Sequence, residues 1–194
     1  MFKRFTSPER AAEDAAVGVE PPVAAGSAAE TATARQIVAR LDAMPPSDAR
    51  YLACFAYVMS RAAQADLNIS EEESALMERF AVEYGGLDEA QAILVVGMTK
   101  LQATIEGATE DYVVTREFRE ISTMEQRLQL LRCCFAVEAA DGTINAEEAS
   151  VVNEIARELD IERPDLNRVR DEFHEQLSSV QALRQAGGGE PASA

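Results

Sequence analysis

Residues 140–148 read Ala-Asp-Gly-Thr-Ile-Asn-Ala-Glu-Glu, and residues 65–73 read Ala-Asp-Leu-Asn-Ile-Ser-Glu-Glu-Glu. The two stretches lie 75 positions apart and share five of their nine residues. The similarity continues beyond them, because apolar residues recur there at matching helical spacings. The matched pairs are Leu76 and Val151, Met77 and Val152, Phe80 and Ile155, Ala81 and Ala156, and Tyr84 and Leu159. This internal repeat predicts a fold built on a duplicated helix–loop–helix unit.

Each copy carries the signals for a helix that begins just after the loop. Ser70 and Glu73 have the spacing of a capping box, and so do Asn145 and Glu148. In that motif the cap side chain accepts a hydrogen bond from the amide three residues on, and the glutamate accepts one from the amide of the cap residue. The isoleucine just before each cap is the apolar residue that both loops share, and we expect it to be buried.

Helical spacing dominates the chain, and no stretch alternates apolar and polar residues for long enough to predict a strand. We therefore expect an all-α fold, a compact bundle of seven to eight helices. Ser47 is expected to cap the helix that follows two prolines, and Ser122 with Glu125 to begin another helix. The spacing of apolar residues from Pro164 to Val180 predicts one continuous last helix.

The two ends of the chain differ in composition from the part between them. Residues 1–34 are rich in small and polar residues and contain Pro21-Pro22, so we expect a disordered Ala/Pro-rich tail. Residues 184–194 are expected to form a flexible Gly-rich tail. The helical domain is accordingly expected at residues 35–183.

The chain has 194 residues, of which 34 are acidic and 18 basic, and its formal net charge is -16. Such a charge repels phosphate and therefore counts against nucleic acid and anionic lipid as partners. No apolar run is long enough to cross a bilayer, and the N-terminus does not resemble a secretory signal. Three cysteines without C-x-x-C spacing favour a reducing compartment, so we expect a cytoplasmic protein.

Few residues in the sequence indicate catalysis. Cys54, Cys133 and Cys134 are read as small core residues, with redox thiols or soft metal ligands as the alternative. His174 is the one histidine, and the sequence offers it no nucleophile or acid partner. We therefore expect no catalytic residues and no enzyme activity, and no cofactor other than a candidate cation.

The aspartates of the two loops, Asp66 and Asp141, need a compensating group. Each is expected at the C-terminal end of a helix, where the backbone carbonyls already carry partial negative charge. A turn amide, a basic side chain or a cation would compensate. Gly142 is expected to provide a left-handed helix end in the second loop, whereas Leu67 occupies the matching place in the first.

The two loops resemble the TerB-like family, which is named for the tellurite-resistance protein TerB and occurs also at the N-terminus of a membrane-anchored DnaJ-like co-chaperone. The family pattern is Ala-Asp-Gly, an apolar residue, a cap, and Glu seven places after the Asp. Residues 140–148 match it in full, and residues 65–73 match it except at Leu67. The resemblance covers about residues 45–182. It implies a compact helical fold and acidic residues that bind metal. It does not imply co-chaperone activity, because no His-Pro-Asp motif occurs.

Two hypotheses follow for the acidic residues. In the first, Asp66, Glu73, Asp141 and Glu148 bind a divalent cation, Ca²⁺ or Mg²⁺, which prefers clustered oxygen ligands, and the protein acts in a tellurite, metal or stress response. Neither loop is an EF-hand, because that motif needs glycine at its sixth position and glutamate at its twelfth, and both loops have other residues there. In the second, the chain is a pure protein–protein interaction module for an unknown protein partner, and its acidic residues are helix caps and Asx turns.

Overall fold

The computed structural model describes residues 28–63, 69–103 and 111–187. These residues form nine α-helices and one 3₁₀ helix, with a single isolated β-bridge and no strand among them. The helices are α1 (Ala28–Asp42), α2 (Pro46–Ala62), α3 (Glu71–Glu83), α4 (Glu89–Ala103), α5 (Asp111–Ile121), α6 (Met124–Glu138), α7 (Ala146–Glu158), α8 (Arg163–Glu172), η2 (His174–Gln176) and α9 (Ser178–Gly187). The all-α prediction is confirmed, with slightly more helices than expected.

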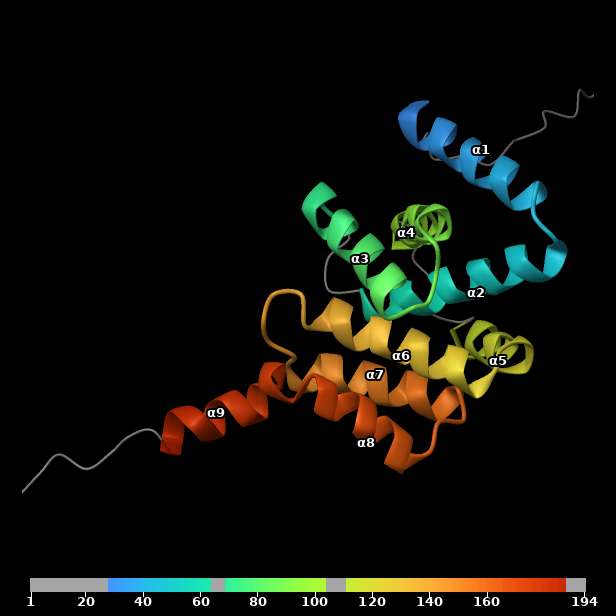
Figure 1. Ribbon diagram of the computed structural model, residues 1–194. Helices are drawn as coiled ribbons and strands as arrows, with labels where there is room; N and C mark the ends of the chain where they lie inside the picture. The colour runs from blue at the N-terminus through green and yellow to red at the C-terminus, as the bar shows by residue number, and fades with distance from the viewer. Residues whose placement is uncertain (1–27, 64–68, 104–110, 188–194) are drawn as a thin grey trace, which may run out of the picture.

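The centre of the fold is α2, which contacts α1, α4, α5, α6 and α7 (Figure 1). One face of α2 is buried, with Leu52, Phe55 and Met59 all fully shielded from solvent. From α6, Leu131 and Phe135 are equally buried and face the same core. The predicted apolar stripes of these two helices are thus the interior of the molecule.

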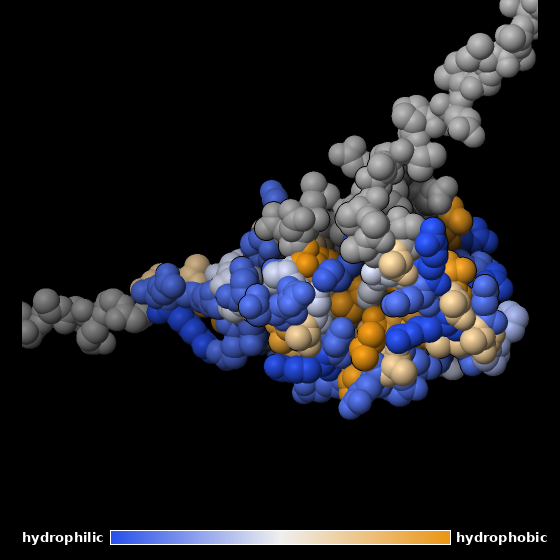
Figure 2. Space-filling view, turned by 90° about the horizontal axis from the view of Figure 1, so that it is seen from above, coloured by the Kyte–Doolittle hydropathy of each residue, from blue (hydrophilic) through white to orange (hydrophobic). Residues whose placement is uncertain are grey.

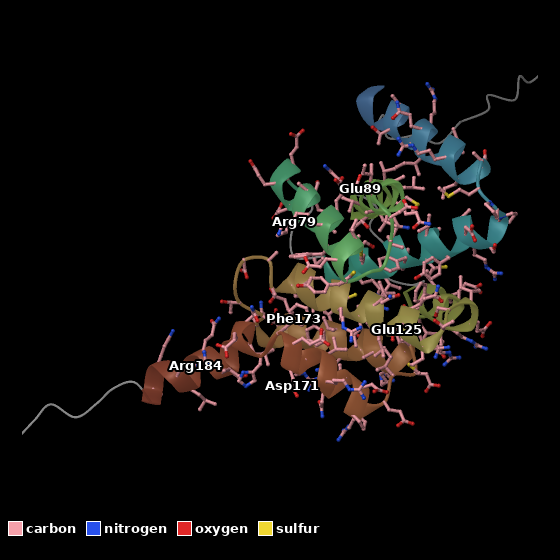
Figure 3. All side chains as sticks on the ribbon, in the orientation of Figure 1. Arg79, Glu89, Glu125, Asp171, Phe173 and Arg184 are labelled. Carbon is pink, nitrogen blue, oxygen red and sulfur yellow. The ribbon has the colours of Figure 1, made fainter. Side chains whose placement is uncertain are left out.

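A short series of aromatic rings joins the two halves of the sequence. Phe173, at the end of α8, stacks on Phe135 of α6 with a centroid separation of 5.6 Å. Its edge meets Tyr84 of the first half at 5.9 Å. Figure 3 shows Phe173 within the layer where α6 and α8 meet. Such pairs stabilise a fold by about 0.5–1.5 kcal/mol beyond the burial of their area.

The helix starts follow the predicted caps in both repeats. Ser70 and Glu73 exchange both bonds of a capping box before α3, and Asn145 and Glu148 do so before α7. Asp88 and Gln91 make the same reciprocal pair of bonds at the start of α4. The local sequence is therefore sufficient to fix where these three helices begin.

The ends of α3 and α7 are closed by equivalent bonds, except that the first half has one residue more, which is a one-residue gap between the two matching sequences. The Leu87 amide donates to the Ala81 carbonyl at 3.2 Å, and the Ile161 amide to the Ala156 carbonyl at 2.9 Å. A left-handed residue precedes each apolar residue, Gly86 with φ 66° and Asp160 with φ 58°. The first half needs one residue more to close the same turn, so the gap lies at the helix end.

Two predictions about helix starts are wrong. The helix after the prolines begins at Pro46 with Pro45 as its N-cap, so Ser47 is not the cap. The capping box before α6 uses Thr123 and Gln126, not Ser122 and Glu125. The Ser122 hydroxyl instead donates to the Phe118 carbonyl at 2.5 Å, which closes the end of α5.

The predicted last helix is divided into α8, η2 and α9. The break occurs where the backbone of Ile144 pairs with the chain around Leu177. The Ile144 amide donates to the Gln176 carbonyl at 2.7 Å, and the Ser178 amide donates to the Ile144 carbonyl at 2.9 Å. A continuous helix would use these groups internally, so the pairing and the helix exclude each other.

The ends of the helical region differ from the predicted bounds. α1 begins at Ala28, ahead of the expected start near residue 35, and α9 continues to Gly187. α9 extends away from the body of the molecule (Figures 1 and 2). Residues 1–27 and 188–194 lie outside the described part of the chain. No helix within that part has both the length and the apolar character needed to cross a membrane.

Candidate functional site

A surface pocket of about 420 Å³ lies where α3 meets the C-terminal end of α6 and the start of α7. Its lining combines an apolar wall with carboxylates from both halves of the sequence. The lining residues are Ala62, Ala63, Ile69, Glu72, Glu73, Leu76, Met77, Phe80, Val137, Glu138, Ala140, Asp141 and Glu148. The helix packing thus brings Glu73 and Glu148, which lie 75 positions apart in sequence, to one pocket.

The predicted site residues can be placed in this pocket with one exception. Glu73 comes from the first turn of α3, Asp141 from the turn after α6, and Glu148 from the first turn of α7. Asp66 lies outside the described residues. Three of the four predicted carboxylates therefore line the same pocket.

Glu73 and Glu148 hold equivalent positions because each is the third residue of a capped helix. The Ser70 amide donates to Glu73 Oε2 at 2.7 Å, and the Asn145 amide donates to Glu148 Oε2 at 2.8 Å. The bond from the Ser70 amide, supported by the Ser70 side chain, lowers the pKa of Glu73, so this carboxylate is charged at neutral pH. Among the described contacts each glutamate uses Oε2 for its cap.

Asp141 is compensated by the turn that it begins. Its Oδ1 accepts a hydrogen bond from the Thr143 amide at 2.9 Å, which makes an Asx turn. Gly142 has φ 93°, so the predicted left-handed residue is confirmed. A turn amide, the first of the three compensating groups expected from the sequence, is therefore present, and Asp141 remains exposed at the pocket.

The loop that carries Asp141 is fixed in place by the C-terminal segment. Besides the backbone pairing of Ile144, the Gln181 side chain donates to the Gly142 carbonyl at 3.0 Å. The Thr143 hydroxyl also bonds Gln181 Oε1 at 3.1 Å. Ile144 itself is only 1% exposed, as predicted. Residues of α9 thus determine where one wall of the pocket lies.

Sequence reasoning missed one functional candidate, Glu138 at the end of α6. This side chain lines the pocket but is only 8% exposed. Burial, with further contributions from Glu148 and Asp141, raises its pKa to about 8. Within the described residues no hydrogen bond or ion pair reaches its carboxyl group. Its position three residues before Asp141, on a helix that is otherwise apolar there, is the signal that could have identified it.

The carboxylates are near one another without forming a finished coordination site. In residues 28–63, 69–103 and 111–187, no group of three or more His, Cys, Asp or Glu side chains is arranged to hold a metal ion. A cation bound here would have to draw the side chains together. The acidic pocket is thus a region of concentrated negative charge beside an apolar wall.

The cysteines lie in the core, where burial outweighs the effect of neighbouring charges. Cys133 and Cys134 are fully buried, and burial raises the pKa of Cys134 to about 12. Burial also raises the pKa of Cys54. A raised thiol pKa disfavours the thiolate, which is the reactive form. The packing role predicted for these residues agrees with their positions, and His174 is exposed on η2.

The helical part of the chain that carries the pocket matches the model of a known family. The family model described as Tellurite resistance protein TerB matches residues 51–171 of this chain. The match covers most of the chain, from α2 to α8, and includes every helix that lines the pocket. The chain therefore belongs to the TerB family, and the predicted resemblance is confirmed. No curated protein and no solved structure matches the chain.

Proposed function

We propose that this TerB-family domain binds a hard divalent cation, Ca²⁺ or Mg²⁺, at the acidic pocket, and that it acts without catalysis in a tellurite, metal or stress response. The observation that supports this most is Glu138, a buried carboxyl group with no described partner, which lines the same pocket as Asp141 and Glu148. A cation would give these groups the opposite charge that no described side chain of the lining supplies.

The chemistry of the residues suits the proposed ligand. Ca²⁺ and Mg²⁺ bind carboxylate oxygens, and Glu73, Glu138, Asp141 and Glu148 all bring such oxygens to the pocket. Because the described carboxylates must converge first, part of the binding free energy is used to order them. We therefore expect weak binding, which suits a protein that responds to raised metal concentrations.

The cellular setting is part of the same proposal. All three cysteines are unpaired and buried. Free thiols persist in a reducing compartment, which supports a cytoplasmic location.

Thermal unfolding of metal-stripped protein tests the proposal. A ligand that binds only the folded state raises stability by about 2.7 kcal/mol at a hundredfold excess over Kd. Millimolar Ca²⁺ or Mg²⁺ should therefore raise Tm by more than NaCl of equal ionic strength does, since salt alone screens the net charge of -16.

Two matched variants locate the effect. Asp141→Asn keeps an acceptor for the Thr143 amide and should remove most of the divalent shift. Glu147→Gln makes the same change of charge on an exposed neighbour that does not line the pocket, and it should retain the shift. Equal shifts in NaCl, or a full divalent response in Asp141→Asn, would show that the pocket is not a cation site.

The second candidate function is a protein–protein interaction module whose acidic residues only cap helices and turns. The observation in its favour is that every described member of the two motifs already makes its local bond. This alternative predicts no divalent response in the same experiment. Loss of stability in Glu148→Ala, equal with and without Ca²⁺, would support it, because alanine cannot accept the bond from the Asn145 amide.

A further inference from the structure

The pocket has a second part that a cation does not explain. Ile69, Leu76, Phe80 and Val137 are half-buried and form an apolar wall beside the carboxylates. A hydrated cation gains nothing from such a surface, and about 420 Å³ is within the range of pockets that enclose organic groups. The wall indicates an occupant that carries a large apolar side chain.

The charge of the pocket further restricts that occupant. Among the described residues, the lining contains four glutamates and Asp141 and no lysine or arginine. A ligand that covers the apolar wall also brings its neighbouring groups close to these carboxylates. A segment with an aromatic side chain next to Lys or Arg would match both parts of the surface.

One segment of this chain outside the described residues has that chemistry. Residues 1–5 read Met-Phe-Lys-Arg-Phe, so two adjacent cations lie between two aromatic residues. The other segments outside the described residues, 64–68, 104–110 and 188–194, contain no lysine or arginine. We propose that the segment Phe2–Phe5 docks in the acidic pocket of its own chain, with an aromatic ring on the apolar wall and Lys3 and Arg4 beside the carboxylates.

The connection to the folded domain permits this contact. Residues 6–27 join the segment to the first residue of α1. A chain of that length spans up to about 75 Å when extended, which exceeds the diameter of a domain of this size. A tethered segment also acts at a local concentration on the order of millimolar, so even a weak contact is populated. The docking does not depend on the proposed cation site, although both use the same carboxylates.

The absence of tryptophan from the chain provides a direct test in the full-length protein. Phe5→Trp introduces a single fluorophore in the segment, measured in the absence of divalent cations. Docking predicts emission at shorter wavelength and severalfold weaker quenching by acrylamide than in a Phe5→Trp protein that also carries Lys3→Glu and Arg4→Glu. Val19→Trp places the fluorophore in the same tail away from the basic residues, and it should remain fully quenched.

A matched pair of substitutions tests the location. Glu72 lines the pocket and Glu71 does not, although both are exposed residues of the same helical turn. In the Phe5→Trp background, Glu72→Lys should restore quenching, whereas Glu71→Lys should leave the protection intact. Equal effects of the two changes would overturn the assignment to this pocket.

The remaining outcomes also decide the proposal. Protection that grows with protein concentration would mean that the segment docks on a second copy, which overturns docking within one chain. Emission and quenching equal to those of Val19→Trp would overturn the proposal altogether.

Mg²⁺ should release a docked segment to a greater extent than NaCl of matched ionic strength does, because the segment and the cation use the same carboxylates. A protected fluorophore in the Phe5→Trp protein with no divalent response would support docking while it contradicts the cation site, so the two proposals can fail separately.

Discussion

The glutamate at the end of α3 and the glutamate at the end of α7 occupy the same place in the two repeats, but they have different roles. Glu83 is exposed to solvent. Glu158 is 7% exposed, and its Oε2 accepts a hydrogen bond from Arg61 Nη1 at 2.6 Å. The same arginine nitrogen lies 2.7 Å from the Thr115 hydroxyl, so this ion pair joins α2, α5 and α7. The matching sequences therefore give a helix that ends in glutamate in both halves. The neighbouring helices determine whether that glutamate is exposed or forms a buried ion pair.

The loops before the same two helices differ in a related way. Ile144 is almost completely buried, and the chain around Leu177 pairs with its backbone. Ile69 is only half-buried, at the wall of the pocket. The second half of the chain has α8 and α9 to cover its loop. The comparison shows that one sequence pattern yields a supported loop in one half and an open pocket wall in the other.

The contrast between the two helix ends should give the largest change in the free energy of unfolding, and that change is expected for Glu158→Ala. This substitution removes the carboxylate that pairs with the buried Arg61 side chain, and breaking such a buried pair costs about 3–5 kcal/mol of the free energy of unfolding. Glu83→Ala should change it by less than about 0.5 kcal/mol, as is usual for an exposed site. Urea denaturation of both variants measures the contrast.

A double variant controls for general damage to the core. Arg61→Leu with Glu158→Leu removes both charges and should cost less than Glu158→Ala alone. Similar losses for Glu83→Ala and Glu158→Ala would contradict the distinction between the two helix ends.

The loop isoleucines should show the next largest contrast. Ile144→Ala opens a cavity in the core and should cost about 2–4 kcal/mol. Ile69→Ala removes a half-exposed side chain and should cost about 1 kcal/mol, since less apolar area returns to water. The same denaturation experiment applies, and a loss below about 0.5 kcal/mol for Ile144→Ala would show that the second loop is not supported as described.

Glu138 should give a smaller effect that depends on pH. Its pKa is raised from 4.5 to about 8, so between these values the folded state binds the proton more tightly than the unfolded state. The free energy of unfolding therefore falls as the pH rises through this range. Glu138→Gln removes the charge that must otherwise be buried, and it should stabilise the protein most near pH 8 and least near pH 4.

Thermal melts of the wild type and Glu138→Gln across pH 4–9 measure this effect, with the exposed Glu147→Gln as the control. A constant difference between wild type and Glu138→Gln at all pH values would contradict the raised pKa. In the first repeat Ala63 stands where Glu138 stands in the second, so the pH dependence belongs to one half of the molecule only.

Features set by neighbours in the sequence could be predicted, and features set by tertiary packing could not. The caps at Ser70 and Asn145 involve residues three positions apart, and both are present. Before α6 the sequence offers two adjacent capping boxes, Ser122 with Glu125 and Thr123 with Gln126. It does not show that the Ser122 hydroxyl is used to close α5, which leaves Thr123 as the cap. The break before α9 depends on Ile144, more than 30 residues earlier, so the periodicity of the last segment could not reveal it.

The candidate site shows the same limit. Three predicted carboxylates line one pocket because both predicted capping boxes form and the helices that carry them lie beside it. Glu138 was missed because its importance comes from burial beside Asp141 and Glu148, which only the packing of α6 on α7 creates. On α4, Ile93 is 48% exposed whereas Val95 is fully buried, and the uninterrupted apolar run of this helix does not show which of its residues face the core.

Calorimetric titration of Ca²⁺, Mg²⁺, Mn²⁺ and Zn²⁺ into metal-stripped, full-length protein is the most direct test of cation binding at the acidic pocket. The account predicts saturable binding of Ca²⁺ or Mg²⁺ that is lost in Asp141→Asn, weakened in Glu138→Gln and unchanged in Glu147→Gln. Heats that match those of dilution for every cation, or equal binding by Asp141→Asn and the wild type, would contradict it and leave the carboxylates as caps and turn formers.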